Sequence, residues 1–143
     1  MPGSVKKYKL DIEDNIQSEI VTIGISTSES EIQLILELNQ LVNVKLAFSE
    51  ELKIIQRQTE HLFSLFRDFD EELEIQYVLL KNNSKQGRFT KEYAQIDFLF
   101  LLNGSLCKPQ GEKVLAKIKN SPRVQTALIL DNSKIKNLKS IPF

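Results

Sequence analysis

The chain has one cysteine, one histidine and no tryptophan among its 143 residues. Cys107 alone cannot form an internal disulfide, and together with His61 it supplies too few ligands for a zinc site within one chain. The longest unbroken apolar run, residues 98–102, is far shorter than the roughly 20 residues that span a bilayer. No apolar stretch follows the charges of Lys6 and Lys7, so we expect no secretory signal and a soluble, cytoplasmic protein without membrane contact.

Motifs for cofactors and nucleophilic catalysis are also absent. The five glycines, at positions 3, 24, 87, 104 and 111, form neither GxGxxG nor GxxxxGK[ST]. The acidic run that starts at Asp68 has Leu73 where a calcium loop has glycine and Leu79 where it has glutamate. No GxSxG elbow is present, and a pair of Cys107 with His61 would have to be assembled by the fold. The sequence therefore predicts no catalytic residue, cofactor or metal ligand, while carboxylate catalysis stays open.

The charges balance, with 19 basic and 19 acidic side chains, but they are unevenly distributed. Residues 107–143 carry eight basic and two acidic groups, a net charge of +6, so residues 1–106 carry −6. Such asymmetry is found in proteins that bind nucleic acid or acidic partners. No aromatic residue interleaves with these lysines to stack on bases, which favours a basic C-terminal segment packed against an acidic body.

Hydrophobic periodicity predicts two helices, residues 30–42 with a capping box from Ser28 to Glu31, and residues 109–120. The predicted strands are residues 5–12, 19–27, 44–48, 61–69, 73–80, 96–103 and 124–130, of which 61–69 and 73–80 form a hairpin. Residues 49–60 fit either a short helix or an irregular connection. Residues 81–95 are the longest predicted loop, and residues 131–143 form a basic tail with apolar side chains that dock on the body.

This order of elements predicts one α+β domain over residues 1–143, with a mainly antiparallel sheet of five or six strands and two helices. Residues 96–103 are apolar on both faces after Asp97, as in a central strand covered on both sides. Gly24 lies inside a predicted strand and indicates a closely packed neighbour there rather than a ligand. Whether both helices cover the same face stays open.

Residues 90–98, TKEYAQIDF, resemble the motif of the IPExxxVDY family of small bacterial proteins. Glu92 and Asp97 match the glutamate and aspartate of the motif, and Ile96 and Phe98 replace its Val and Tyr conservatively, while its opening Ile and Pro are replaced by Thr and Lys. The likeness extends through KLDI and IGIS sequences near the start of the chain to a tail that ends in phenylalanine. The resemblance implies a single fold unit and supplies no activity.

Glu92 and Asp97 are five residues apart, which places them on opposite faces of a strand and about 140° apart on a helix. They are therefore poor ligands for a single metal ion. Asp97 stands at the entrance of a buried strand, where a carboxylate needs hydrogen-bond donors. We expect both carboxylates to accept backbone N–H bonds and to hold the loop of residues 81–95 against the sheet. The alternative is a binding or catalytic role.

Three functions stay open. The first is a non-enzymatic protein-interaction domain, either a homodimer or a partner of another protein, whose contact is an edge strand or the surface of the loop and tail. The second is a small-ligand-binding protein or carboxylate-based enzyme around residues 81–98. The third and least favoured is nucleic-acid binding through the basic C-terminal third, which predicts an affinity that falls steeply with salt.

Overall fold

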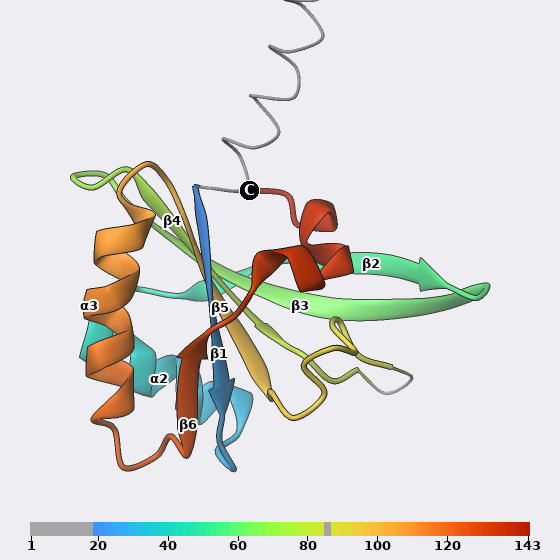
Figure 1. Ribbon diagram of the computed structural model, residues 1–143, viewed down its shortest axis with the longest axis horizontal. Helices are drawn as coiled ribbons and strands as arrows, with labels where there is room; N and C mark the ends of the chain where they lie inside the picture. The colour runs from blue at the N-terminus through green and yellow to red at the C-terminus, as the bar shows by residue number, and fades with distance from the viewer. Residues whose placement is uncertain (1–18, 85–86) are drawn as a thin grey trace, which may run out of the picture.

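A computed structural model describes residues 19–84 and 87–143, in which six strands form one antiparallel sheet (Figure 1). The strand order is β2-β3-β4-β5-β1-β6. The strands are β1 (Ile20–Ser26), β2 (Ala47–Gln56), β3 (Thr59–Asp70), β4 (Ile75–Lys81), β5 (Phe98–Asn103) and β6 (Thr126–Ile129), and the helices are α2 (Glu31–Val42) and α3 (Cys107–Lys119). Two short 3-10 helices, η1 (Asn132–Lys134) and η2 (Lys136–Ser140), follow β6. The predicted α+β fold is confirmed, while the predicted strand at 5–12 lies outside the described residues.

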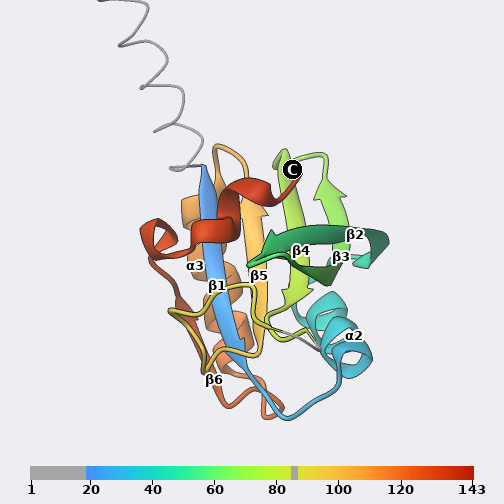
Figure 2. The ribbon, with the colours of Figure 1, turned by 90° about the vertical axis from the view of Figure 1, so that its right-hand side faces the viewer.

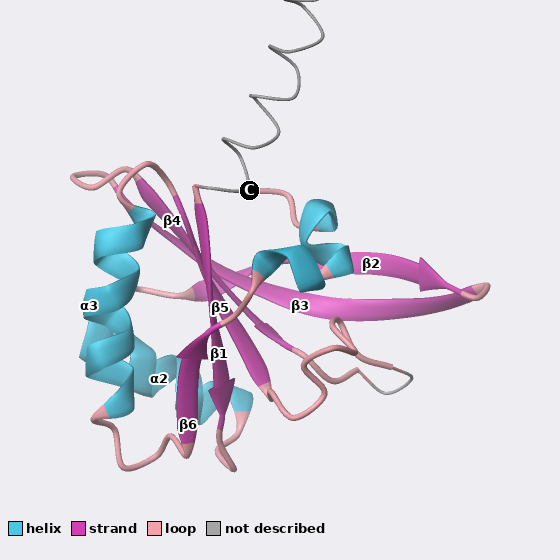
Figure 3. Ribbon diagram, in the orientation of Figure 1, coloured by secondary structure: helices cyan, strands magenta, loops and turns pink. Residues whose placement is uncertain are grey.

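Both helices cover the same face of the sheet (Figure 3). Leu34 and Leu38 of α2 and Val114 of α3 are buried against alternate side chains of β1, β4 and β5. Helix α2 begins at Glu31, one residue later than predicted, and its N-cap is Ser30 rather than Ser28. The Ser30 hydroxyl accepts the backbone N–H of Gln33 at 3.2 Å. The preceding residues form a separate turn, in which the Thr27 hydroxyl accepts the backbone N–H of Glu29.

The opposite face of the sheet is covered by chain segments that contain no α-helix, as seen in Figure 2. The connection between β4 and β5, the C-terminal tail and the outer half of the β2–β3 hairpin pack there on Leu99 and Leu101 of β5. Strand β5 is thus buried on both faces, as predicted. The tail docks through Ile135, Leu138 and Ile141, also as predicted.

Gly24 of β1 supplies the close approach that its position in a strand indicated. A Cβ atom at residue 24 would lie 2.9 Å from a methyl carbon of Leu130 and 3.0 Å from one of Ile96. These side chains belong to the tail side of the sheet, so packed neighbours occupy the space rather than a ligand. The residues that adjoin the tail and the long loop therefore pack directly on the backbone of β1.

Residues 49–60, expected to be a short helix or an irregular connection, are most of β2, a tight turn and the start of β3. The turn consists of Arg57 and Gln58, whose φ angles of 51° and 65° are those of a two-residue hairpin turn. The sequence lacks the Asn-Gly or Asp-Gly signature of such turns, which is why the prediction was wrong. The β2–β3 hairpin extends beyond the other strands, away from α2 and α3 (Figure 1).

Candidate functional site

Asn82, at the start of the long loop, is the residue that fixes the shape of this loop. Its side chain is completely buried, and its Nδ2 lies 2.9 Å from the carbonyl oxygen of Ile96, 3.1 Å from that of Tyr93 and 3.4 Å from that of Thr90. Its Oδ1 accepts the backbone N–H of Thr90 at 2.8 Å. Its backbone N–H donates to the Asp97 carbonyl and its own carbonyl accepts the N–H of Phe89, both at 2.8 Å. One side chain thus satisfies buried backbone groups along the whole connection.

Asp97 joins the end of this loop to the end of β1. Its Oδ2 accepts the backbone N–H of Thr27 at 2.9 Å, and its own backbone N–H donates to the carbonyl of Ile25 at 2.9 Å. The carboxylate therefore accepts a backbone N–H, as expected, but from the residue after β1 rather than from the loop. Its geometry is that of a structural acceptor.

Glu92 does not act in the way we expected, because its described contacts are side-chain groups rather than backbone N–H groups. Its Oε2 accepts the hydroxyl of Thr90 at 3.3 Å, and its Oε1 lies 4.0 Å from Nζ of Lys136. The other two residues of the motif are buried on opposite sides of the sheet, Phe98 under the helices and Ile96 under the tail. The four motif residues do not converge on one site.

Cys107 and His61 are not brought together. Cys107 is buried on the helix side of the sheet, and burial raises the pKa of its thiol. His61 is opposite Ile54 in the β2–β3 hairpin and lies against Gly87 on the tail side. Its Nδ1 is 3.4 Å from the hydroxyl oxygen of Ser84. Among residues 19–84 and 87–143, no group of three or more His, Cys, Asp or Glu side chains could hold a metal ion.

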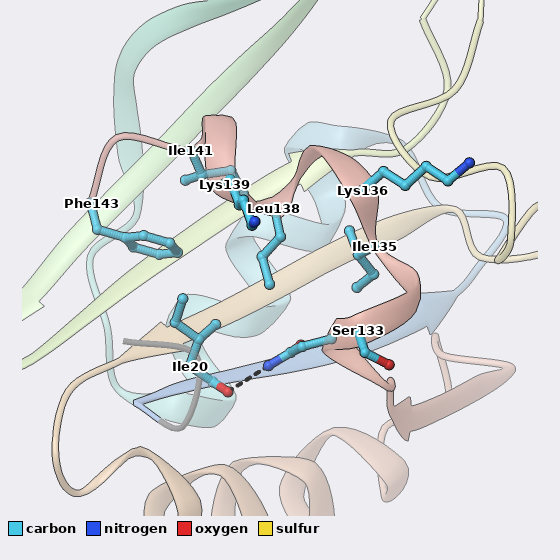
Figure 4. A pocket seen from close by; sticks show the side chains of 9 residues that line it. Ile20, Ser133, Ile135, Lys136, Leu138, Lys139, Ile141 and Phe143 are labelled. Atoms are coloured by element: carbon cyan, nitrogen blue, oxygen red, sulfur yellow. Dashed lines mark hydrogen bonds between the residues drawn. The ribbon is translucent and has the colours of Figure 1, made fainter. Parts of the chain in front are cut away.

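The tail encloses an open pocket of about 460 Å³ against the start of β1 (Figure 4). Ile20, Leu138, Ile141 and Phe143 give it apolar walls, and Lys136 and Lys139 stand at its border. Its amide side chain, Asn132, is occupied in holding the tail: Nδ2 donates to the Ile20 carbonyl at 2.8 Å, and Oδ1 accepts the hydroxyl of Thr22 at 2.6 Å.

The outer face of the β2–β3 hairpin is the most unusual surface. We define this face by the side chains that alternate with the buried Ile54 and Phe63, namely Glu51, Lys53, Ile55, Glu60 and Leu62. Ile55 is 68% exposed and Leu62 is 47% exposed, although both are large and apolar. Lys53 and Glu60 form an ion pair of 3.1 Å between them. The face thus combines exposed apolar side chains with charges of both signs.

The basic C-terminal third contacts acidic groups of the body at two points. Nε of Arg123 lies 3.1 Å from a carboxylate oxygen of Glu37, and its NH1 lies 4.0 Å from one of Glu29. Lys136 approaches Glu92. Four lysines of α3 are exposed, at positions 108, 113, 117 and 119. The expected packing of the basic segment against an acidic body is therefore seen at Arg123 and Lys136, while α3 keeps a positive outer surface.

Comparison of the chain with models of known protein families and with curated protein sequences found no match. The resemblance to the IPExxxVDY family stays a prediction. In the described part of the chain, no helix is both long enough and apolar enough to cross a membrane.

Proposed function

We propose that the chain is a non-enzymatic protein-interaction domain whose contact surface is the hairpin outer face. The observation that supports this proposal is the exposure of Ile55 in the edge strand β2 and of Leu62 in the neighbouring strand β3. An edge strand presents unpaired backbone N–H and C=O groups, and natural proteins usually protect such edges when they are not used for binding. Exposed apolar side chains beside an edge strand are typical of a surface that is covered by a partner.

The two faces of the hairpin differ in a way that favours this proposal. Ile54, Phe63 and Leu65 on the inner face are buried in the core beneath the long loop and tail, so they stabilise the fold. Ile55 and Leu62 on the outer face are 68% and 47% exposed, so they bury less surface within the chain than the inner-face side chains and contribute less to its stability. Binding is a physical reason to keep large apolar side chains there.

The test is affinity capture from the source cells with the tagged full-length chain and a double variant, Ile55→Ser with Leu62→Ser. The matched control is Ile32→Ser with Leu36→Ser, because these two side chains of α2 are 69% and 58% exposed and also apolar. We expect the hairpin variant to lose proteins that the wild type and the α2 variant retain, in moderate salt and after nuclease treatment. Identical bound proteins in all three samples, and an identical oligomeric state, would overturn the proposal.

A small-ligand-binding protein is the second candidate, and the pocket of Figure 4 favours it over a carboxylate site at the long loop. Apolar walls with Lys139 at the border suit a short aliphatic carboxylate. Octanoate is a suitable probe in a thermal unfolding assay. A saturable rise in melting temperature that Leu138→Ser abolishes would support this function, and no shift up to millimolar octanoate would exclude this ligand class.

A further inference from the structure

The turn at Arg57 and Gln58 determines which backbone groups of β2 point away from the sheet. In a two-residue hairpin turn, the residues that flank it form a hydrogen-bonded pair, here Gln56 with Thr59. Hydrogen bonding to β3 then alternates along β2 through Ile54 and Leu52. The backbone N–H and C=O groups of Glu51, Lys53 and Ile55 consequently face outward, and in the described part of the chain no strand pairs with this side of β2.

The residues with outward backbone groups also have their side chains on the hairpin outer face, because both properties alternate with the same period of two. Glu51, Lys53 and Ile55 are all exposed. A strand added to this edge would therefore place its own side chains beside a carboxylate, an ammonium group and an isoleucine. The best partner strand has an ammonium group opposite Glu51 and a carboxylate opposite Lys53.

The sequence of β2 meets this requirement itself. If two copies of β2 pair antiparallel about a two-fold axis at Leu52, Glu51 of each copy lies opposite Lys53 of the other. Shifting the axis by one residue in either direction places Glu51 opposite Glu51 or Lys53 opposite Lys53, and like charges directly opposite each other are unfavourable. The charge pattern thus selects one register among the three.

We propose that the partner of the hairpin outer face is a second copy of this chain, paired through β2 with Glu51 of each copy opposite Lys53 of the other. This inference rests on the proposed interaction function and names its partner. The two opposed pairs provide about four intermolecular backbone hydrogen bonds. Ile55 of each copy lies at one end of this ladder on the outer face, where the second copy covers part of its exposed surface, whereas Leu62 lies one strand further from the partner, on β3.

The register shift between Phe48 and Glu50 limits the length of the shared ladder. It inserts Ser49 as an extra residue at the edge, so regular geometry runs only from Glu50 to the turn. A dimer centred on Leu52 uses residues 50–54, which lie entirely within this regular stretch. The short ladder predicts a reversible dimer rather than continuing strand addition, because both β2 edges are consumed when it forms.

Charge exchange tests the pairing. Sedimentation equilibrium is measured from about 1 to about 500 μM for the full-length wild type, Glu51→Lys, Lys53→Glu and the double exchange. We expect a reversible wild-type dimer, a dissociation constant at least about tenfold higher for each single variant, and recovery in the double exchange. Glu72→Lys in the turn between β3 and β4 makes the same charge change away from the edge and should leave the wild-type constant unchanged.

Cysteine cross-linking tests the register independently. Leu52→Cys would place two thiols opposite each other at the dimer axis, within disulfide distance in a non-hydrogen-bonded pair. Ile55→Cys is the control, since its two copies would be about 20 Å apart. Mild oxidation should give a covalent dimer only for Leu52→Cys, and cross-linking of Ile55→Cys instead would overturn the proposed register.

The outcomes separate this inference from the function on which it rests. A wild-type chain that is monomeric at every concentration, or dimeric with the same constant in all charge variants, overturns the β2 dimer. If such a monomer still captures another protein and loses it in the Ile55→Ser with Leu62→Ser variant, the interaction function stands with a different partner. A wild-type chain that neither dimerises nor captures another protein overturns both the β2 dimer and the interaction function.

Discussion

Replacement of Asn82 by alanine should destabilise the protein more than any other single polar substitution in the long loop. The change removes the donor to the carbonyl of Ile96 and the acceptor for the N–H of Thr90, at 2.9 and 2.8 Å. Ile96 and Thr90 are themselves buried, so water cannot replace the hydrogen-bond partners that their backbone groups lose. An unsatisfied buried donor or acceptor costs about 1–3 kcal/mol, which gives a loss of about 2–6 kcal/mol for the two groups.

Urea and thermal unfolding followed by circular dichroism measure this loss. A central value of about 4 kcal/mol corresponds to a melting temperature lower by roughly 10–15 °C in a domain of this size. Native-state hydrogen exchange should show the backbone N–H groups of Phe89 and Thr90 losing protection first, because both bond to Asn82.

Two further variants separate lost hydrogen bonds from lost volume. Asn82→Asp keeps the volume and one acceptor but directs a carboxylate toward three carbonyl oxygens, so it should be at least as destabilising as alanine. Asn83→Ala removes an exposed contact with Arg88 and should cost less than about 0.5 kcal/mol. A loss under about 1 kcal/mol for Asn82→Ala, or equal losses at 82 and 83, would refute the assignment of Asn82 as the residue that holds the loop.

Asp97→Asn should lower the free energy of unfolding by about 1–2 kcal/mol, because a neutral oxygen replaces the carboxylate that accepts the Thr27 N–H. An unchanged urea midpoint would argue for a functional role of Asp97. Gly104→Ala should lower the free energy of unfolding by at least about 2 kcal/mol, since φ is +153° and a Cβ would lie 2.6 Å from the Glu74 carbonyl oxygen. A variant with the stability of the wild type would contradict this geometry. Burial raises the pKa of the Cys107 thiol above its ordinary value of 9.0. The contribution of the neutral thiol to the free energy of unfolding is therefore complete below about pH 8 and is lost as pH rises through the folded pKa. Cys107→Ala should flatten this alkaline loss of stability in urea titrations, and identical pH profiles for wild type and variant would contradict the argument.

Strongly periodic segments were predictable because local pattern and tertiary burial agree in them. Residues 96–103 are apolar on both faces, and β5 is the strand with helices on one side and loop and tail on the other. Residues 61–69 and 73–80 were predicted as a hairpin and form the paired strands β3 and β4. The tail was expected to dock because its apolar residues have no other place to be buried, and it does.

Most of β2, residues 49–56, could not be predicted, because the turn that follows it contains neither glycine nor asparagine. Arg57 and Gln58 both adopt positive φ angles, which side chains with a Cβ adopt at an energetic cost that the long β2–β3 pairing offsets. The charges around Lys53, and the adjacent apolar Ile55 on the other face, also hide the alternation of Leu52 and Ile54. The sequence signal for this part of β2 was two apolar residues, Leu52 and Ile54, at a spacing of two, which is too short a pattern to favour a strand.

Asn82 was missed for a different reason, since its local sequence is that of an ordinary polar loop. Its partners are 8 to 14 residues away, and only the folded connection brings their backbone groups around one amide. The carboxylates of the motif were easier to notice because charge near a buried strand is conspicuous. In the described part of the chain, the neutral amide of Asn82 organises the loop, whereas the contacts of Glu92 are with the side chains of Thr90 and Lys136.

The length of the long loop now has a physical reason, and it bears on function. Helices cover one face of the sheet, so Val78, Leu80 and Leu99 on the other face must be buried by loop and tail, and irregular chain over a core needs internal hydrogen-bond partners. Asn82 supplies those partners, and Asp97 ties the end of the loop to β1. Asn82 and Asp97 thus have a structural explanation, which Glu92 lacks. The hairpin outer face does not cover the sheet in this way, since its Ile55 is 68% exposed, and it is there that a search for binding should begin.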